Sequence, residues 1–154
     1  MSIPMDELSC IRGGHAEIRL AVDCQTALPL AITAWLERTR ARTAVFVAPD
    51  DAALRSLARV MPVFAPDHQV LMLPAWDNLP YDRARPSRQV TGMRVTTLDR
   101  LADRHRRQLG QPILLLSSPE ALLQRVPPME RLQERAITLR TGQSLDAARN
   151  PRRR

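Results

Sequence analysis

Short apolar runs alternate along this chain with segments of helical period. The runs occupy residues 43–47, 70–73 and 112–116, and a weaker run occupies residues 18–22. Their apolarity is continuous rather than alternating, which is typical of strands buried on both faces of a parallel sheet. The pattern therefore predicts buried parallel strands in these runs.

Between the runs, apolar residues recur at the spacing of one helix face. Asp50 or Asp51 stands where the second helix needs an N-cap, because a carboxylate accepts hydrogen bonds from the first free backbone N–H groups. Ser118, Pro119 and Glu120 predict the start of a fourth helix. The three longer stripes are Leu28, Ile32, Trp35 and Leu36; Leu54, Leu57, Ala58 and Met61; and Val90, Met93, Thr97, Leu98 and Leu101.

Strand and helix alternation of this kind predicts an α/β fold, a parallel sheet flanked by helices and joined by right-handed crossovers. We expect an N-terminal segment at residues 1–15 and the α/β domain at 16–126. Pro127 and Pro128 mark the boundary. Residues 127–154 then resemble the start of a second small α+β domain, with one strand at 135–140, a turn opening a helix at 142–148 and a basic tail.

The composition narrows the class of protein. Hydrophobic residues make up 44% of the chain but aromatic residues only 3%, so the core must be aliphatic. The formal charge is +7, and every one of the 23 basic residues is arginine. Cys10 and Cys24 lack metal-like spacing, so free thiols in a reducing cytoplasm are the better interpretation. Neither a run of about 18 apolar residues nor a cationic leader is present, and a cytoplasmic location is expected.

An α/β domain raises the question of nucleotide binding. The strand at 17–22 leads into Asp23, Cys24, Gln25 and Thr26, where a phosphate-binding loop would lie. A working loop needs glycines, so that backbone N–H groups reach the phosphates, and a lysine as a point charge. This loop has no glycine and the chain has no lysine. We therefore predict a degenerate site that neither binds nor hydrolyses nucleotide.

Other catalytic arrangements are equally weak. Asp77 and Asp82 could form an acid pair, but such residues more often cap turns beside prolines. Ser117 and Ser118 are better explained as a helix cap than as a nucleophile, because no glycine-flanked elbow surrounds them. The three histidines are scattered: His15, His68 and His105. We predict no catalytic residue, no metal site and no cofactor.

Arginines gather in one stretch and define what we call the arginine cluster. Against Asp99 and Asp103 they give the stretch a net charge of +6. A solvated helix face is one interpretation, and contact with phosphates or with an acidic protein is the other, since arginine matches both bidentately. The members are Arg83, Arg85, Arg88, Arg94, Arg100, Arg104, Arg106 and Arg107.

The most distinctive stretch is the aromatic loop at residues 74–83. Its two prolines fix φ and favour extended neighbours, and Trp76 and Tyr81 are the expected packing anchors, with Trp76 largely buried against the sheet. The loop resembles the Trp-(acidic)-x-Leu-Pro-Tyr-Asp signature of bacterial transcription-repair coupling factors, which are relatives of excinuclease B. Residues 44–50, 94–101 and 121–128 resemble further stretches of that family in order. The signature positions here are Trp76, Leu79, Pro80, Tyr81, Asp82 and Arg94.

The resemblance implies a P-loop-NTPase-like domain that has lost its nucleotide site, followed by the incomplete beginning of an excinuclease-B-like interaction domain. In that family the whole protein is an ATP-dependent, helicase-like DNA translocase that acts in transcription-coupled nucleotide excision repair of DNA damage. The motor and polymerase-binding domains lie downstream. The resemblance thus identifies this chain as a non-catalytic N-terminal module or truncated fragment.

By the same resemblance, the partners are the rest of the coupling factor and excinuclease A, the latter bound weakly or not at all by this chain alone. Arg94 is a separate case within the arginine cluster, because it matches a residue of the corresponding helix in that family. Instead of contacting phosphates or a partner, it is expected as an alternative to tie this helix to the aromatic loop. The main alternative function is an arginine-rich DNA-binding module without base specificity, using the stretch at 83–107. A nucleotide hydrolase is the remote third.

Overall fold

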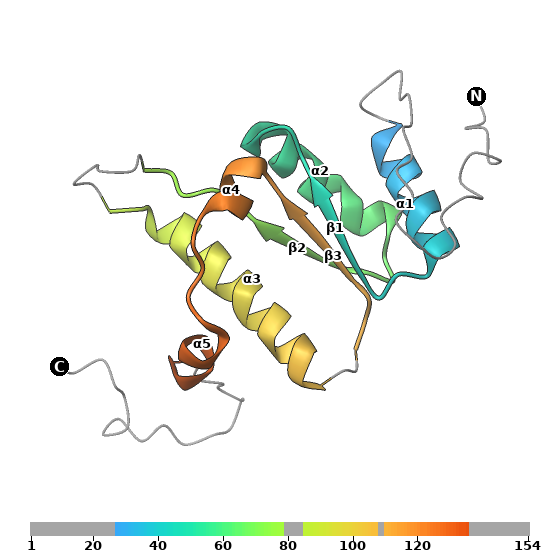
Figure 1. Ribbon diagram of the computed structural model, residues 1–154. Helices are drawn as coiled ribbons and strands as arrows, with labels where there is room; N and C mark the ends of the chain where they lie inside the picture. Colours follow the sequence, from blue (N-terminus) through green and yellow to red (C-terminus); the bar gives the residue numbers. More distant parts are fainter. Residues whose placement is uncertain (1–26, 79–84, 108–109, 136–154) are drawn as a thin grey trace, which may run out of the picture.

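The computed structural model describes residues 27–78, 85–107 and 110–135 of the chain. Helices and strands follow one another in the order that the sequence predicts, with one helix in addition (Figure 1). The elements are α1 (Leu28–Thr39), β1 (Thr43–Val47), α2 (Asp51–Phe64), β2 (Gln69–Leu73), α3 (Arg88–Arg107), β3 (Ile113–Ser117), α4 (Pro119–Leu123) and α5 (Met129–Arg135).

The three strands form one parallel sheet in the order β1-β3-β2. The central strand, β3, is buried at all five positions. Val47 and Leu73 both pair with Ser117, so all three strands end together at one edge of the sheet. We call this the carboxyl edge.

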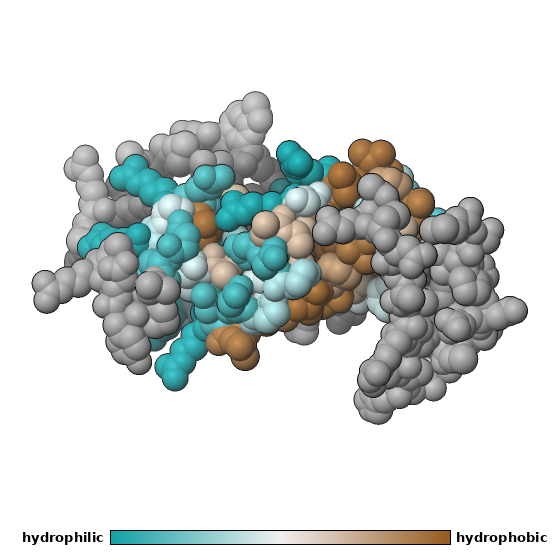
Figure 2. Space-filling model, turned by 90° about the horizontal axis from the view of Figure 1, so that it is seen from above, coloured by the Kyte–Doolittle hydropathy of each residue, from teal (hydrophilic) through white to brown (hydrophobic). Residues whose placement is uncertain are grey.

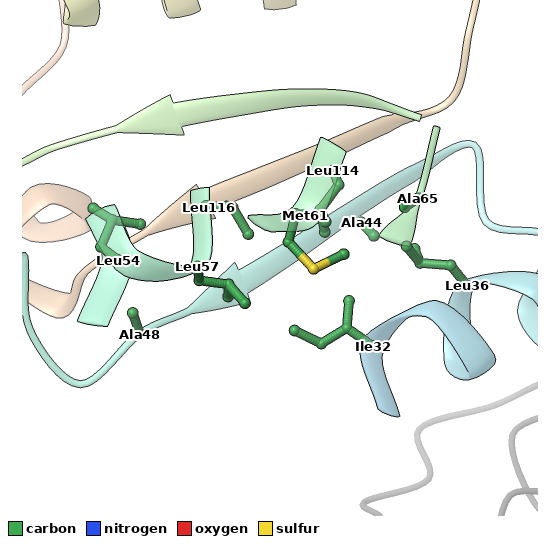
Figure 3. Packing of buried hydrophobic residues seen from close by; sticks show 10 residues of the cluster. All are labelled: Ile32, Leu36, Ala44, Ala48, Leu54, Leu57, Met61, Ala65, Leu114 and Leu116. Atoms are coloured by element: carbon green, nitrogen blue, oxygen red, sulfur yellow. The ribbon is translucent and has the colours of Figure 1, made fainter. Parts of the chain in front are cut away.

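Helices cover the sheet unevenly. On one face, α1 and α2 pack over alternate residues of β1 and β3 and form the larger core cluster (Figure 3). On the other face, α3 packs through Leu98 and Leu101 on β2 and β3 alone, and α5 packs against α3. The larger cluster consists of Ile32, Leu36, Ala44, Ala48, Leu54, Leu57, Met61, Ala65, Leu114 and Leu116.

Local sequence signals account for where α1 and α2 begin and end. Asp50 is extended, and its carboxylate accepts a hydrogen bond from Ala53 N at 2.8 Å, which fixes the start of α2. Pro62 lies in the last turn of α2, where it removes one i→i−4 hydrogen bond, and the helix ends two residues later at Phe64. Arg40 takes a left-handed conformation with φ of 48° and ends α1, its N–H bonding to Leu36 O.

The structure corrects one prediction about the sheet. The run at 43–47 was expected to be buried on both faces, yet Val45 and Val47 are 52% and 46% exposed. These side chains point to the face of α3, and α3 covers β2 and β3 instead of β1. Continuous apolarity correctly indicated a strand, but not that one face of that strand lies open.

The helix at 129–135 was not predicted, because the sequence there carries no apolar stripe beyond Met129 and Leu132. The other predicted elements agree with the structure to within a few residues. The predicted strand at 17–22 and the structure predicted for 136–154 lie outside the described residues. In the described ranges, no helix combines the length and apolarity needed to cross a bilayer.

Candidate functional site

The carboxyl edge of the sheet is where doubly wound α/β domains bind their ligands. Three segments meet there: the turn from β1 into α2, the start of the aromatic loop after β2, and the turn from β3 into α4. The side chains that join these segments come from α2, α3, the aromatic loop and both ends of α4. The site is therefore built from residues far apart in the sequence.

Arg94 on α3 lies at the centre of this edge and is only 1% exposed. Its Nη1 donates to Pro74 O at 2.5 Å and to Gln124 Oε1 at 3.2 Å. Its guanidinium carbon lies 4.4 Å from the centroid of the Trp76 ring, a cation–π contact. Arg94 thus ties α3 to the aromatic loop and to the residue that follows α4.

The environment of the guanidinium is poor in acceptors. Nε and Nη2 of Arg94 are buried and have no hydrogen-bond partner among the described residues. Burial lowers the pKa of Arg94, and the negative charge of Asp51 opposes that shift only in part. Holding this cation at the edge therefore costs desolvation energy, which its hydrogen bonds and the Trp76 ring must offset.

Gln124 completes the connection between the aromatic loop and the end of α4. Its Oε1 accepts a hydrogen bond from Trp76 N at 2.9 Å as well as the one from Arg94. One side-chain amide therefore fixes the loop backbone and the guanidinium together. The sequence analysis did not single out Gln124 as a site residue, although it lies in the stretch 121–128 that resembles the family.

Asp51, in the first turn of α2, joins the remaining segments. Its Oδ1 accepts from Ser118 Oγ at 3.0 Å and from Ala75 N at 3.5 Å, and its Oδ2 lies 3.7 Å from Arg55 Nη2. The helix N-terminus, a common anion site, is thus already supplied with a carboxylate. We call these linked side chains, Asp51, Trp76, Arg94, Ser118 and Gln124, the edge network.

The two serines at the end of β3 are structural, but not in the way predicted. Ser118 stands at the N-cap position of α4 yet makes no side-chain cap bond; its hydroxyl donates to Asp51. Ser117 Oγ donates to Leu73 O at 3.1 Å, across to β2. Thr97 of α3 similarly donates to Met72 O at 2.6 Å. Both hydroxyls fasten β2 to its neighbours.

Asp77 closes the base of the aromatic loop. Its Oδ1 accepts from Ser87 N at 2.9 Å, and Ser87 Oγ in turn accepts from Val90 N at 3.2 Å in the first turn of α3. The hydrogen bonds from Ser87 lower the pKa of the exposed Asp77 carboxyl. Asp77 acts here as a turn acceptor, which is the role that the sequence favoured over an acid pair.

The structure therefore brings Trp76 and Arg94 together from the predicted signature. Trp76 is partly buried, and its ring stacks on the Arg94 guanidinium. The other signature positions, Leu79, Pro80, Tyr81 and Asp82, lie outside the described residues, as does the degenerate loop at 23–26.

The arginine cluster does not form one uniform surface. Arg85, Arg88 and Arg100 are exposed, Arg104 donates to Gly110 O at 2.8 Å, and Arg94 is buried. Arg83 and the side chains of Arg106 and Arg107 lie outside the described part of the chain. Viewed from above, hydrophilic residues gather on the left of the surface and hydrophobic ones on the right, the side on which α1 lies (Figure 2).

No group of three acidic, histidine or cysteine side chains capable of holding a metal ion occurs among the described residues. The edge network instead consists of internal hydrogen bonds, one weak ion pair and one stacked cation. Its geometry holds in place the loops that meet at the carboxyl edge.

Comparison with known proteins relates this chain to one family. No family model matches the chain, and no solved structure matches it. The transcription-repair-coupling factor of Mycobacterium tuberculosis (strain CDC 1551 / Oshkosh) is 31% identical over 138 residues, which are 89% of this chain and 10% of that protein. That of Escherichia coli (strain K12) is 30% identical over 129 residues, 84% of this chain and 11% of that protein. The chain spans about a tenth of the length of these relatives.

Proposed function

This chain is a region related to the transcription-repair coupling factors, and from that relationship we propose that it is a non-catalytic N-terminal module of such a factor. In this role it contributes a folded scaffold to the machinery that connects a stalled RNA polymerase with nucleotide excision repair. ATP-driven translocation on DNA belongs to other parts of the parent protein.

The edge network is the observation that carries the non-catalytic assignment. At the carboxyl edge, Asp51 places a carboxylate in the first turn of α2, and Arg94 is committed to Pro74 O and Gln124. A triphosphate at this edge would meet negative charge and would need the arginine that locks the aromatic loop. The sequence supports the same conclusion, since it contains no lysine and no glycine at 23–26.

We propose further that the parent protein reaches the excision machinery through excinuclease A, with the region after residue 127 forming the start of the interaction domain. The module described here would hold the aromatic loop and α3 in a fixed relation to that domain. This partner is inferred from the sequence signature at 74–83, of which residues 74–78 lie in the described structure.

A chimaera tests the proposal. The matching N-terminal region of the Escherichia coli coupling factor is replaced by this chain, and repair of the transcribed strand is measured. We expect the chimaera to retain strand-specific repair, because the two sequences share 30% identity over 129 residues. A chimaera that carries Trp76→Ala and Arg94→Ala is the matched control and should lose part of that activity.

A soluble chimaera that hydrolyses ATP yet shows no preference for the transcribed strand would overturn the proposal. The alternative, a DNA-binding module, rests on the exposed Arg85, Arg88 and Arg100. It predicts that the chain alone binds duplex DNA with an affinity that falls steeply as salt rises. Titrating the isolated chain with DNA at two salt concentrations separates the two functions.

A further inference from the structure

Helix α4 has little of the burial that normally holds a short helix in place. It contains five residues, and isolated helices shorter than about 12 residues are marginal in water. Of these five residues, all of them described, only Ala121 is buried, and Leu122 and Leu123 are 47% and 88% exposed. The position of α4 therefore depends largely on the contacts at its two ends.

Both ends of α4 are held by groups that also hold the aromatic loop. At the start, Ser118 Oγ donates to Asp51 Oδ1 at 3.0 Å, and the same oxygen accepts from Ala75 N at 3.5 Å. At the end, Gln124 Oε1 accepts from Trp76 N at 2.9 Å. Two successive backbone N–H groups of the loop are thus bound by two acceptors, one at each end of the helix.

Arg94 supports the second of these contacts. Its Nη1 donates to Gln124 Oε1 at 3.2 Å and to Pro74 O at 2.5 Å, so the residue after α4 and the first residue of the loop share one donor. Because the guanidinium is buried, breaking one of these bonds leaves polar groups unpaired away from water. Hydrogen bonds linked in this way support one another, and we expect them to break together.

Gln124 also sets the direction in which the chain leaves the carboxyl edge. Its backbone is extended, with φ of −79° and ψ of 139°, and it ends α4. Residues 125–128 follow, with two prolines that restrict the backbone, and lead to α5, which packs against α3. Figure 1 shows this segment leaving α4 and running to α5. The path from the sheet to α5 therefore begins at a residue that the aromatic loop holds.

We propose that residues 74–76 of the aromatic loop and residues 118–124 form a latch, a single unit that opens and closes as one. In the closed state, Gln124 fixes the exit of the chain toward α5. A partner that draws the loop away releases α4 and that exit, and tension on the segment after α4 loosens the loop by the same free energy. The consequence for a partner-binding region after residue 127 rests on the proposed function, whereas the latch itself does not.

Amide exchange in the full 154-residue chain, followed by NMR, tests the latch. The reporters are the amides of Ala75 and Trp76 in the loop and of Leu122 in α4, the last of which donates to Ser118 O at 3.1 Å. We expect all three to exchange with the same free energy of opening, and Leu115 in the central strand to exchange more slowly. Exchange of Leu122 at the rate of an unprotected amide, beside a protected Trp76, would overturn the proposal.

Substitutions at the end of α4 supply a matched set. Gln124→Ala removes the acceptor for Trp76 N, and we expect it to speed exchange at Ala75 and Leu122 as well, by at least about tenfold, although both keep their own acceptors. Gln124→Glu retains an acceptor oxygen and should keep most of the protection. Arg125→Ala changes the exposed neighbouring residue and is the control, which should alter none of these rates.

Faster exchange at Trp76 alone in Gln124→Ala would contradict the latch, because the loop and the helix would then open independently. An equal increase at Leu115 would also contradict it, because that result would indicate a general loss of stability instead of the release of one unit. Neither result depends on repair activity, so the latch can fail while the chimaera succeeds, and the reverse.

Discussion

Burying Arg94 at the carboxyl edge costs desolvation free energy. Its guanidinium is 1% exposed, and among the described residues two of its nitrogens have no hydrogen-bond partner, so its other contacts must offset this cost. Those contacts join three segments: the carbonyl of Pro74, the amide of Gln124 and the ring of Trp76. The arginine therefore serves to position the aromatic loop, and the loop geometry depends on it.

Truncating this arginine should destabilise the fold. We expect Arg94→Ala to lower the free energy of unfolding by about 2–4 kcal/mol, since it leaves a buried void and removes the donor to Pro74 O. Urea denaturation measures this loss. Arg100→Ala on the same helix is the control and should change stability by less than about 0.5 kcal/mol, because Arg100 is exposed. Equal losses in the two variants would contradict the positioning role.

Trp76 and Arg94 should be energetically coupled. The sequence alone suggested that Trp76→Ala would cost about 3–5 kcal/mol, the range for a buried aromatic residue. Because the ring is partly buried, we expect a loss of about 3 kcal/mol, at the lower end of that range. A double-mutant cycle with Arg94→Ala should give a coupling energy of about 0.5–2 kcal/mol. Strict additivity would show that the stacked geometry contributes nothing.

At the scale of elements, the start of α3 and the base of the aromatic loop are held by one carboxylate. Asp77 accepts from Ser87 N, and the side-chain and backbone hydrogen bonds of Ser87 together lower the pKa of Asp77 below its ordinary value of 3.8. A carboxyl whose folded pKa is depressed stabilises the fold above its unfolded pKa and loses that effect as pH falls through the folded value.

We accordingly expect the closure of the loop by Asp77 to be complete above pH 3.8 and to be lost below it, as the carboxyl protonates. The chemical shifts of Asp77 and of the Ser87 amide, followed by NMR between neutral and acid pH, should move together with a midpoint below 3.8. Asp77→Asn should remove the pH dependence at Ser87. A midpoint at or above 3.8 would show that the hydrogen bond does not persist in solution.

The elements themselves could largely be predicted from the sequence, because each depends on short-range signals. Apolar runs gave the strands to within a residue or two, and Asp50 marked the start of α2. The open face of β1 could not be predicted, since it depends on where α3 packs on the sheet. The roles of Gln124 and Asp51 in the edge network could not be predicted for the same reason, because their hydrogen-bond partners lie 24 to 67 residues away in sequence.

The candidate site, like the fold, could be predicted only in part. The contact between Arg94 and the aromatic loop was suggested by the signature, and the geometry supplies it. The roles of Ser117 and Ser118 were identified as structural, but their bonds run to β2 and α2 instead of to α4. A serine before a proline-started helix predicts the cap position well; which acceptor its hydroxyl chooses is decided by the packing of distant elements.

For the molecule as a whole, we predict that nucleotides do not bind. The chain has no lysine, and the carboxyl edge is filled by the side chains of the edge network. Isothermal calorimetry of the full chain with ATP and Mg²⁺ should give no heat of binding at micromolar concentration. Arg94→Ala, which opens the edge, should not create binding, because Asp51 remains in the first turn of α2. Micromolar affinity in either protein would sink the assignment of a non-catalytic module.

The last prediction concerns excinuclease A. We assume that recruitment by the coupling factors uses the interaction domain that is predicted to begin at residue 127. Of that region the structure describes residues 127–135, which include the single short helix α5. A surface so small cannot offset the entropy of ordering it on a partner. We expect interferometry to show binding of excinuclease A to the full Escherichia coli coupling factor and at least about a hundredfold weaker binding to this chain. Submicromolar binding to the chain would contradict this prediction and would place the contact with excinuclease A on the first domain.

In that case, substituting the exposed Arg85, Arg88 and Arg100 would show whether the arginine cluster makes the contact with excinuclease A. Arg55→Ala on α2 is the control.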